Sequence, residues 1–98
     1  MINVFPFAGF PIAVFGLGQS GIASALALQE SDAEVLAWDD NEDARAAAEA
    51  EGVALTDLYA CEWREMTTLL VSPGVPLDHP EAHPIVATAR AANCEVIG

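Results

Sequence analysis

The sequence predicts an α/β fold, a Rossmann-like three-layer α/β/α domain with a five-stranded parallel sheet. Short apolar runs alternate with segments of helical periodicity, and no hairpin signal separates neighbouring runs. A glycine-rich loop, Val-Phe-Gly-Leu-Gly-Gln-Ser-Gly at residues 14–21, directly continues the first clear apolar run. Because a pair of parallel strands needs a crossover that packs on the sheet, this alternation predicts helices on both faces.

The first half of the chain predicts two strands and two helices in alternation. Ile12–Phe15 is fully apolar, as expected of a strand that is buried on both faces. After the glycines, residues 22–31 carry apolar side chains at helical spacing, and Glu34–Trp38 is predicted to be the second strand. Asn41 is a suitable cap for the second helix, and Gly52 is well placed to end it.

The second half predicts three further strands and a last helix. Val53–Leu55 is predicted to be a short third strand, Glu62–Met66 a single helical turn, and Thr68–Ser72 the fourth strand. Pro84 is predicted to begin the last helix, at a position where its missing N–H removes no hydrogen bond. Glu95–Ile97 completes the sheet as the fifth strand.

The composition indicates one acidic, cytoplasmic domain. Ninety-eight residues, of which 53% are hydrophobic, suffice for a single core. The 15 acidic residues outnumber the 3 basic ones, and a net charge of −12 would repel nucleic acid and anionic membranes, so neither is expected as a partner. Two cysteines are too few for a disulfide scaffold, which favours the cytoplasm. Any bound phosphate must therefore be held by local groups.

No metal site and no catalytic residue is expected. His79 and His83 have a spacing that could place both on one turn of a helix, but Pro80 and Pro84 oppose a continuous helix there. A turn that leads into the last helix is the simpler interpretation. The sequence also contains no legible Ser-His-Asp arrangement.

The glycine loop has the pattern of a phosphate-binding turn. Gly16 would permit the tight turn, Gly18 would let the backbone approach a phosphate, and Gly21 would let the helix pack closely on the strand. Free amides at the start of the helix would then bind the anion. Glycines also occur in ordinary turns, so the loop supports a nucleotide site mainly because a strand precedes it and a helix follows it.

An acidic residue follows the second strand, at the position where nucleotide-binding folds contact their ligand. Asp39 lies 18 positions after Gly21 and could accept hydrogen bonds from the ribose of NAD, while the Asp39-Asp40 pair would repel the extra phosphate of NADP. Asp39 could equally accept from the imide N–H of uracil. Either aspartate could instead serve only to start the helix after Asn41.

Taken together, the motifs resemble the N-terminal domain of the Mur ligases. The resemblance rests on the glycine loop, on Ala-Trp-Asp-Asp-Asn at residues 37–41, on Ser-Pro-Gly-Val-Pro-Leu at 72–77 with His79-Pro80 after it, and on the closing Glu-Val-Ile-Gly. These motifs run over nearly the whole chain. Within the family, the similarity is closest to the members that add D-glutamate.

The resemblance implies a site for a uridine diphosphate sugar. Gly18, Gln19 and Ser20 would face the diphosphate with their amides. Asp39 and Asp40 would lie beside the uracil, and Gly74 would approach the nucleotide from a neighbouring strand end. The implied site comprises Gly16, Gly18, Gln19, Ser20, Gly21, Asp39, Asp40, Ser72 and Gly74. Asp40 is a departure from the family pattern, because it adds a second negative charge near an anionic ligand.

The resemblance also implies chemistry that this chain does not contain. Mur ligases use ATP and Mg²⁺ to activate a carboxylate that an amino acid then attacks. The sequence has no Gly-x-x-x-x-Gly-Lys-Ser/Thr loop and no lysine at all. Residues 1–98 are therefore interpreted as a substrate-binding domain, inactive alone, whose partners would be UDP-N-acetylmuramoyl-L-alanine and the central and C-terminal domains of the whole ligase.

Two other functions remain open at the level of sequence. One is an NAD-binding domain of a dehydrogenase or of a regulatory sensor, which would share the glycine loop and the acidic residue but would not need the Ser-Pro-Gly-Val-Pro segment. The other is an interaction domain whose glycines serve only packing. The choice of ligand distinguishes all three.

Overall fold

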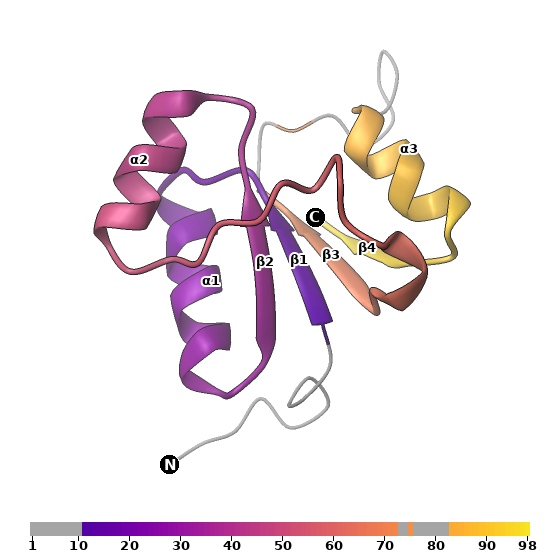
Figure 1. The fold of residues 1–98 in the computed structure, drawn as a ribbon, viewed down its shortest axis with the longest axis horizontal. Helices are drawn as coiled ribbons and strands as arrows, with labels where there is room; N and C mark the ends of the chain where they lie inside the picture. The colour runs from indigo at the N-terminus through magenta and orange to yellow at the C-terminus, as the bar shows by residue number, and fades with distance from the viewer. Residues whose placement is uncertain (1–10, 73–74, 76–82) are drawn as a thin grey trace.

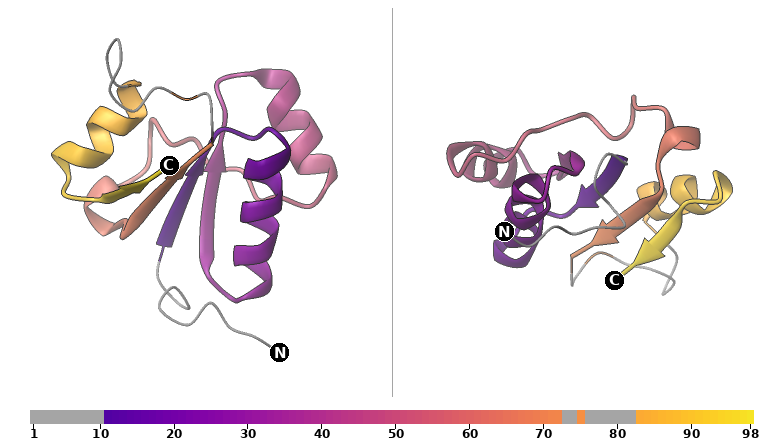
Figure 2. Two further views of the ribbon diagram at one scale, coloured as in Figure 1. Left: turned by 180° about the vertical axis from the view of Figure 1, so that it is seen from behind. Right: turned by 90° about the horizontal axis from the view of Figure 1, so that it is seen from below.

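The structure is a computed structural model, and it describes residues 11–72, 75 and 83–98. A parallel sheet lies between helices in the ribbon views (Figures 1 and 2). In chain order the elements are β1 (Pro11–Phe15), α1 (Gln19–Glu30), β2 (Glu34–Trp38), α2 (Glu42–Ala50), the 3₁₀ turn η2 (Trp63–Glu65), β3 (Thr68–Val71), α3 (Pro84–Ala91) and β4 (Glu95–Ile97). None of the described helices is both long enough and apolar enough to cross a bilayer.

The sheet has the order β2-β1-β3-β4, and all three strand pairs are parallel. From β1 the chain moves outward to β2, and it then returns across β1 to form β3 on the other side. The direction of the connections therefore reverses between β1 and β3. In open α/β sheets, ligands bind outside the carboxyl ends of the strands at such a reversal.

The alternating side chains of β1 divide the interior into two cores. Ile12 and Val14 join a cluster with Ala25 of α1 and Ala48 of α2. The neighbouring positions face a second cluster that includes residues from α3, β3 and the segment around η2, among them Ile85, Leu69 and Trp63. Helices thus cover both faces of the sheet, as the alternating pattern predicted.

The predicted third strand is the one element that differs. The described residues form a four-stranded sheet, and Val53–Leu55 contributes only an isolated parallel bridge between Leu55 and Ala37 of β2. The backbone donors of this segment bind elsewhere. Val53 N donates to Ala48 O at 3.0 Å, and Ala54 N donates to the side-chain Oε1 of Gln29 at 2.9 Å. A regular ladder beside β2 cannot form while these donors are engaged by α1 and by the end of α2.

The helix signals in the sequence are confirmed. Asn41 accepts a hydrogen bond from Ala44 N at 3.0 Å and so caps α2. Gly52, just beyond the end of α2, has a φ of +100°. Pro84 is the first residue of α3, and the predicted turn within Glu62–Met66 is η2.

Candidate functional site

The three glycines of the turn between β1 and α1 differ in what surrounds them. Gly16 has a φ of +95°, and a Cβ there would lie 2.8 Å from Cβ of Ser72. A Cβ on Gly21 would lie 1.8 Å from the carbonyl oxygen of Gly16. Gly18 has no atom of the described residues within 4 Å of the position its Cβ would take. Gly16 and Gly21 therefore have the predicted turn and packing roles, whereas Gly18 faces open space.

The start of α1 differs from the starts of α2 and α3. No side chain in the described structure caps α1 at Gly18, and its first turn carries no acidic residue. Helix α2 is capped by Asn41 and has Glu42 and Asp43 in its first turn, and α3 is capped by His83. Among the described residues, no side chain accepts from the first-turn amides of α1 at the positive end of its dipole. In a chain with a net charge of −12, this local feature can attract an anion.

Asp39 joins the glycine turn to the turn that follows β2. Its Oδ2 accepts from Leu17 N at 2.7 Å, and its Oδ1 accepts from Asn41 N at 2.8 Å. Arg45 donates to the carbonyl oxygen of Asp39 at 2.7 Å, and its guanidinium lies 4.5 Å from the centre of the Trp38 ring. Asp39 therefore has the structural role that the sequence allowed, at the start of α2, and it also fixes the glycine turn.

Ser72 ties the end of β3 to the same turn. Its hydroxyl donates to the carbonyl oxygen of Gly16 at 2.6 Å, and its amide donates to Phe15 O at 3.0 Å. Gly74, also predicted to belong to the site, lies outside the described residues. The described members of the predicted site lie in the three segments that follow β1, β2 and β3 at one edge of the sheet: Gly16, Gly18, Gln19, Ser20, Gly21, Asp39, Asp40 and Ser72.

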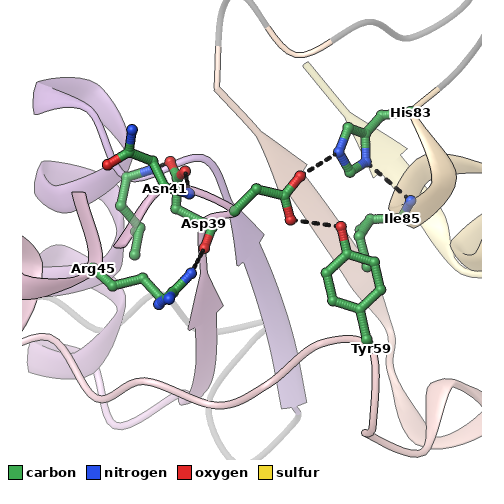
Figure 3. Close-up of polar contacts among 8 residues, drawn as sticks. Asp39, Asn41, Arg45, Tyr59, His83 and Ile85 are labelled. Carbon is green, nitrogen blue, oxygen red and sulfur yellow. Dashed lines mark hydrogen bonds and ion pairs between the residues drawn. The ribbon is translucent and has the colours of Figure 1, made fainter. Parts of the chain in front are cut away.

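Asp40 binds two side chains that the sequence analysis did not assign to the site, Tyr59 and His83, which are labelled in Figure 3. Tyr59 donates its hydroxyl to Oδ1 of Asp40 at 2.6 Å, and Nε2 of His83 lies 2.8 Å from Oδ2. Burial pushes the pKa of Asp40 up, but the hydrogen bonds with Tyr59 and His83 and the positive charges of His83 and Arg45 together outweigh it and hold that pKa below its ordinary 3.8. The carboxylate thus connects the segments after β2, before η2 and before α3.

The sequence that forms this fold matches the family that the motifs resemble. A family model described as the N-terminal domain of MurD-like Mur ligases matches residues 11–98. The chain belongs to this family. The resemblance stated from the motifs is therefore confirmed, and it favours the Mur ligase interpretation over the NAD-binding alternative.

The curated relatives of the MurD-like domain include proteins named UDP-N-acetylmuramoylalanine–D-glutamate ligase. The proteins of Mesorhizobium japonicum and of a Chelativorans species are each 51% identical over 98 residues, and that of Phenylobacterium zucineum is 50% identical. Each match covers 100% of this chain and 21% of the relative. The MurD-like domain thus spans about a fifth of the length of these relatives.

The sequence analysis did not assign to the site three residues that lie at this edge of the sheet, namely Ser24, Tyr59 and His83. A small pocket of about 40 Å³ beside α1 is lined by Val14, Ser20, Gly21, Ser24, Leu70, Val71 and Ser72. Ser24 could have been found, because it lies one helical turn after Ser20 and so shares its face. Tyr59 and His83 carry no such local signal, since they are 19 and 43 residues from Asp40.

The ionisation of Tyr59 tests its contact with Asp40. Burial raises the pKa of Tyr59, and the hydrogen bond to Asp40 and the charges of Asp40 and Asp57 raise it further, from 10.0 to about 12. Tyr59 is the only tyrosine in the MurD-like domain, so phenolate absorbance reports it alone. We expect a titration midpoint near 12, and a lower one in Asp40→Ala. Because folding favours the protonated phenol, its stabilising effect is complete below pH 10 and is lost as the pH rises through about 12.

The denatured chain is the control for this titration, and its midpoint should lie near 10. Circular dichroism at each pH establishes that the domain is still folded where Tyr59 ionises. A midpoint near 10 in the folded domain would contradict the hydrogen bond to Asp40.

Proposed function

We propose that this MurD-like domain binds the uridine diphosphate part of UDP-N-acetylmuramoyl-L-alanine. The observation that carries the proposal is the start of α1 at the reversal of the sheet order. Its first turn has no acidic residue, and no side chain of the described residues caps it or fills the space at Gly18. The name of the relatives supports the identity of the nucleotide sugar.

The diphosphate is proposed to lie against the first turn of α1. Gly18, Gln19 and Ser20 are all exposed, and their amides are the groups that a helix start offers to an anion. Ser20 and Ser24 add hydroxyls from the same face of the helix. Since these donors are neutral, binding does not require the basic side chains that the chain largely lacks.

The uracil is proposed to lie beside Asp39. Both carboxylate oxygens of Asp39 already accept one backbone hydrogen bond, but each oxygen has a second lone pair. The imide N–H of uracil is a donor that this lone pair can accept. The resemblance also assigns Gly74 to this part of the site, and the position of Gly74 in the sequence, two residues after the anchored Ser72, is compatible with that role.

The whole protein is proposed to be a cytoplasmic ligase that joins D-glutamate to the bound substrate. In the full-length enzyme, ATP with Mg²⁺ would activate the substrate carboxylate. Further domains would bind the ATP and the Mg²⁺. The MurD-like domain would contribute binding and orientation of the nucleotide end. It has no lysine for an ATP-binding loop, so we expect no ligation and no ATP hydrolysis by residues 1–98 alone.

Titration of the ¹⁵N-labelled chain with UDP tests the proposal. We expect UDP to shift the amide signals of Gly18, Gln19 and Ser20 and those of the segment at Asp39, at lower concentrations than NAD does. Inorganic diphosphate should shift the α1 signals but leave those near Asp39 largely in place, because it has no base. If NAD acts at lower concentrations than UDP, the site belongs to the dehydrogenase-like class. If neither nucleotide shifts these signals, the proposed function of this chain is wrong.

A further inference from the structure

We infer that Asp40, Tyr59 and His83 are positioning residues, which hold the nucleotide-binding edge in shape without touching the nucleotide. We call these three side chains the Asp40 brace. The inference rests on the proposed function, because it assigns the brace to the uridine nucleotide site. It departs from the expectation that Asp40 itself contacts the uracil.

The contacts of Asp40 occupy both of its carboxylate oxygens. Tyr59 binds one oxygen at 2.6 Å and His83 lies 2.8 Å from the other. Figure 3 shows that the labelled Tyr59 and His83 come from separate segments of the chain. Asp39 is already proposed to bring one carboxylate to the ligand, and a direct contact from Asp40 would add a second negative charge close to the diphosphate, where like charges repel. The brace gives Asp40 a role that avoids this repulsion.

His83 is fixed from two further sides. Its Nδ1 accepts a hydrogen bond from Ile85 N at 3.1 Å, so in the neutral ring the hydrogen is on Nε2 and is donated to Asp40. Its ring centre lies 4.7 Å from that of Phe15, the last residue of β1. The same imidazole therefore caps α3, packs against the end of β1 and binds the segment that follows β2.

The brace can act on the ligand through the neighbour of Asp40. Asp39 directly precedes Asp40, and its carboxylate binds Leu17 N inside the glycine turn at 2.7 Å. Any motion of the backbone at Asp40 is therefore passed to Asp39 and to the amides of the turn. Loss of the brace should weaken UDP binding even though none of its members touches the nucleotide.

Three variants separate the brace from other roles of its members. Asp40→Ala removes the acceptor, and Tyr59→Phe removes one donor while keeping the ring. His83→Asn retains a side chain that can cap α3 but is too short to reach Asp40, so it separates the brace from the cap. It also removes the ring contact with Phe15, and for this reason its effect is compared with that of Tyr59→Phe, which leaves that contact in place. Asp43→Asn is the matched control, because it removes one exposed negative charge in the first turn of α2 and leaves the brace intact.

The first measurement is the dissociation constant for UDP, obtained from amide shifts of the 98-residue chain. We expect Asp40→Ala and His83→Asn each to raise the dissociation constant for UDP by roughly three- to tenfold. The double variant should have a dissociation constant no higher than that of the single variant that binds UDP more weakly, because both changes remove the same interaction. Asp43→Asn should bind as the parent does, or slightly better. If Asp40→Ala weakens binding while His83→Asn and Tyr59→Phe do not, Asp40 contacts the nucleotide directly and the inference is overturned.

The second measurement does not require UDP. Long-range ¹H–¹⁵N spectra should show the hydrogen of neutral His83 on Nε2, and the Asp40→Ala/His83→Asn cycle in the unfolding equilibrium constant should show coupling of roughly threefold or more. If the parent chain does not bind UDP, the proposed function is wrong, and so is the inference that the brace positions a UDP site. Absence of coupling in a chain that does bind UDP overturns the brace alone.

Discussion

Gly21→Ala is expected to destabilise the domain by about 3 kcal/mol and to abolish detectable UDP binding. The added Cβ would lie 1.8 Å from the carbonyl oxygen of Gly16 and 2.8 Å from Oγ of Ser72. The first of these atoms belongs to the backbone and cannot rotate away, so α1 must move off β1. Urea unfolding followed by tryptophan fluorescence measures the loss of stability, and amide shifts measure UDP binding.

Gly18→Ala is the matched control for this prediction. A Cβ at Gly18 would meet no atom within 4 Å in the part of the chain that the structure describes, and the residue has a φ of −77° that alanine adopts without strain. We expect its stability to fall by less than about 1 kcal/mol, the scale of a change at a helix cap, while UDP binding weakens because the methyl group enters the phosphate position. A Gly21→Ala domain as stable as the parent would contradict the close packing of α1 on β1.

Asp39→Ala is expected to weaken UDP binding by about 1–3 kcal/mol and to lower the free energy of unfolding by a similar amount. The variant leaves the amides of Leu17 and Asn41 without the carboxylate that binds them at 2.7 and 2.8 Å. It also removes the proposed acceptor for uracil. Calorimetric or NMR titration gives the change in binding, and urea unfolding gives the change in stability.

Comparison of UDP with inorganic diphosphate separates the two roles of Asp39. Both ligands need the glycine turn, but only UDP carries the imide N–H that Asp39 is proposed to accept. Asp39→Ala should therefore weaken UDP binding more than diphosphate binding. Equal losses for both ligands would mean that Asp39 acts only through the turn.

The parts of the fold that local rules govern could be predicted from the sequence. Asn41 and Pro84 mark the starts of their helices by side-chain and backbone chemistry that does not depend on distant residues. The prediction of a strand at Val53–Leu55 was wrong, because the backbone N–H of Ala54 donates to the side chain of Gln29, which lies 25 residues earlier in the chain. A propensity for strand was thus overridden by a tertiary contact.

The candidate site also contains residues that the sequence could predict and residues that it could not. The roles of Gly16 and Gly21 follow from a spacing that recurs in nucleotide-binding turns, so the sequence was informative. The partners of Asp40 depend on how the segments before η2 and before α3 return to the edge of the sheet. No spacing rule predicts that Tyr59 and His83 meet the same carboxylate, and only the three-dimensional structure identified them.

The bond between Ser72 and Gly16 has a consequence for the order in which the protein is built. These residues are 56 positions apart, whereas Asp39 reaches the turn across only 22. Contacts that close short loops form earlier than those that close long ones, and chains fold from the N-terminus during synthesis. We therefore expect β1, α1 and β2 to associate first on the ribosome. The turn would become competent to hold a nucleotide only after residue 72 has left the exit tunnel and β3 has docked beside β1.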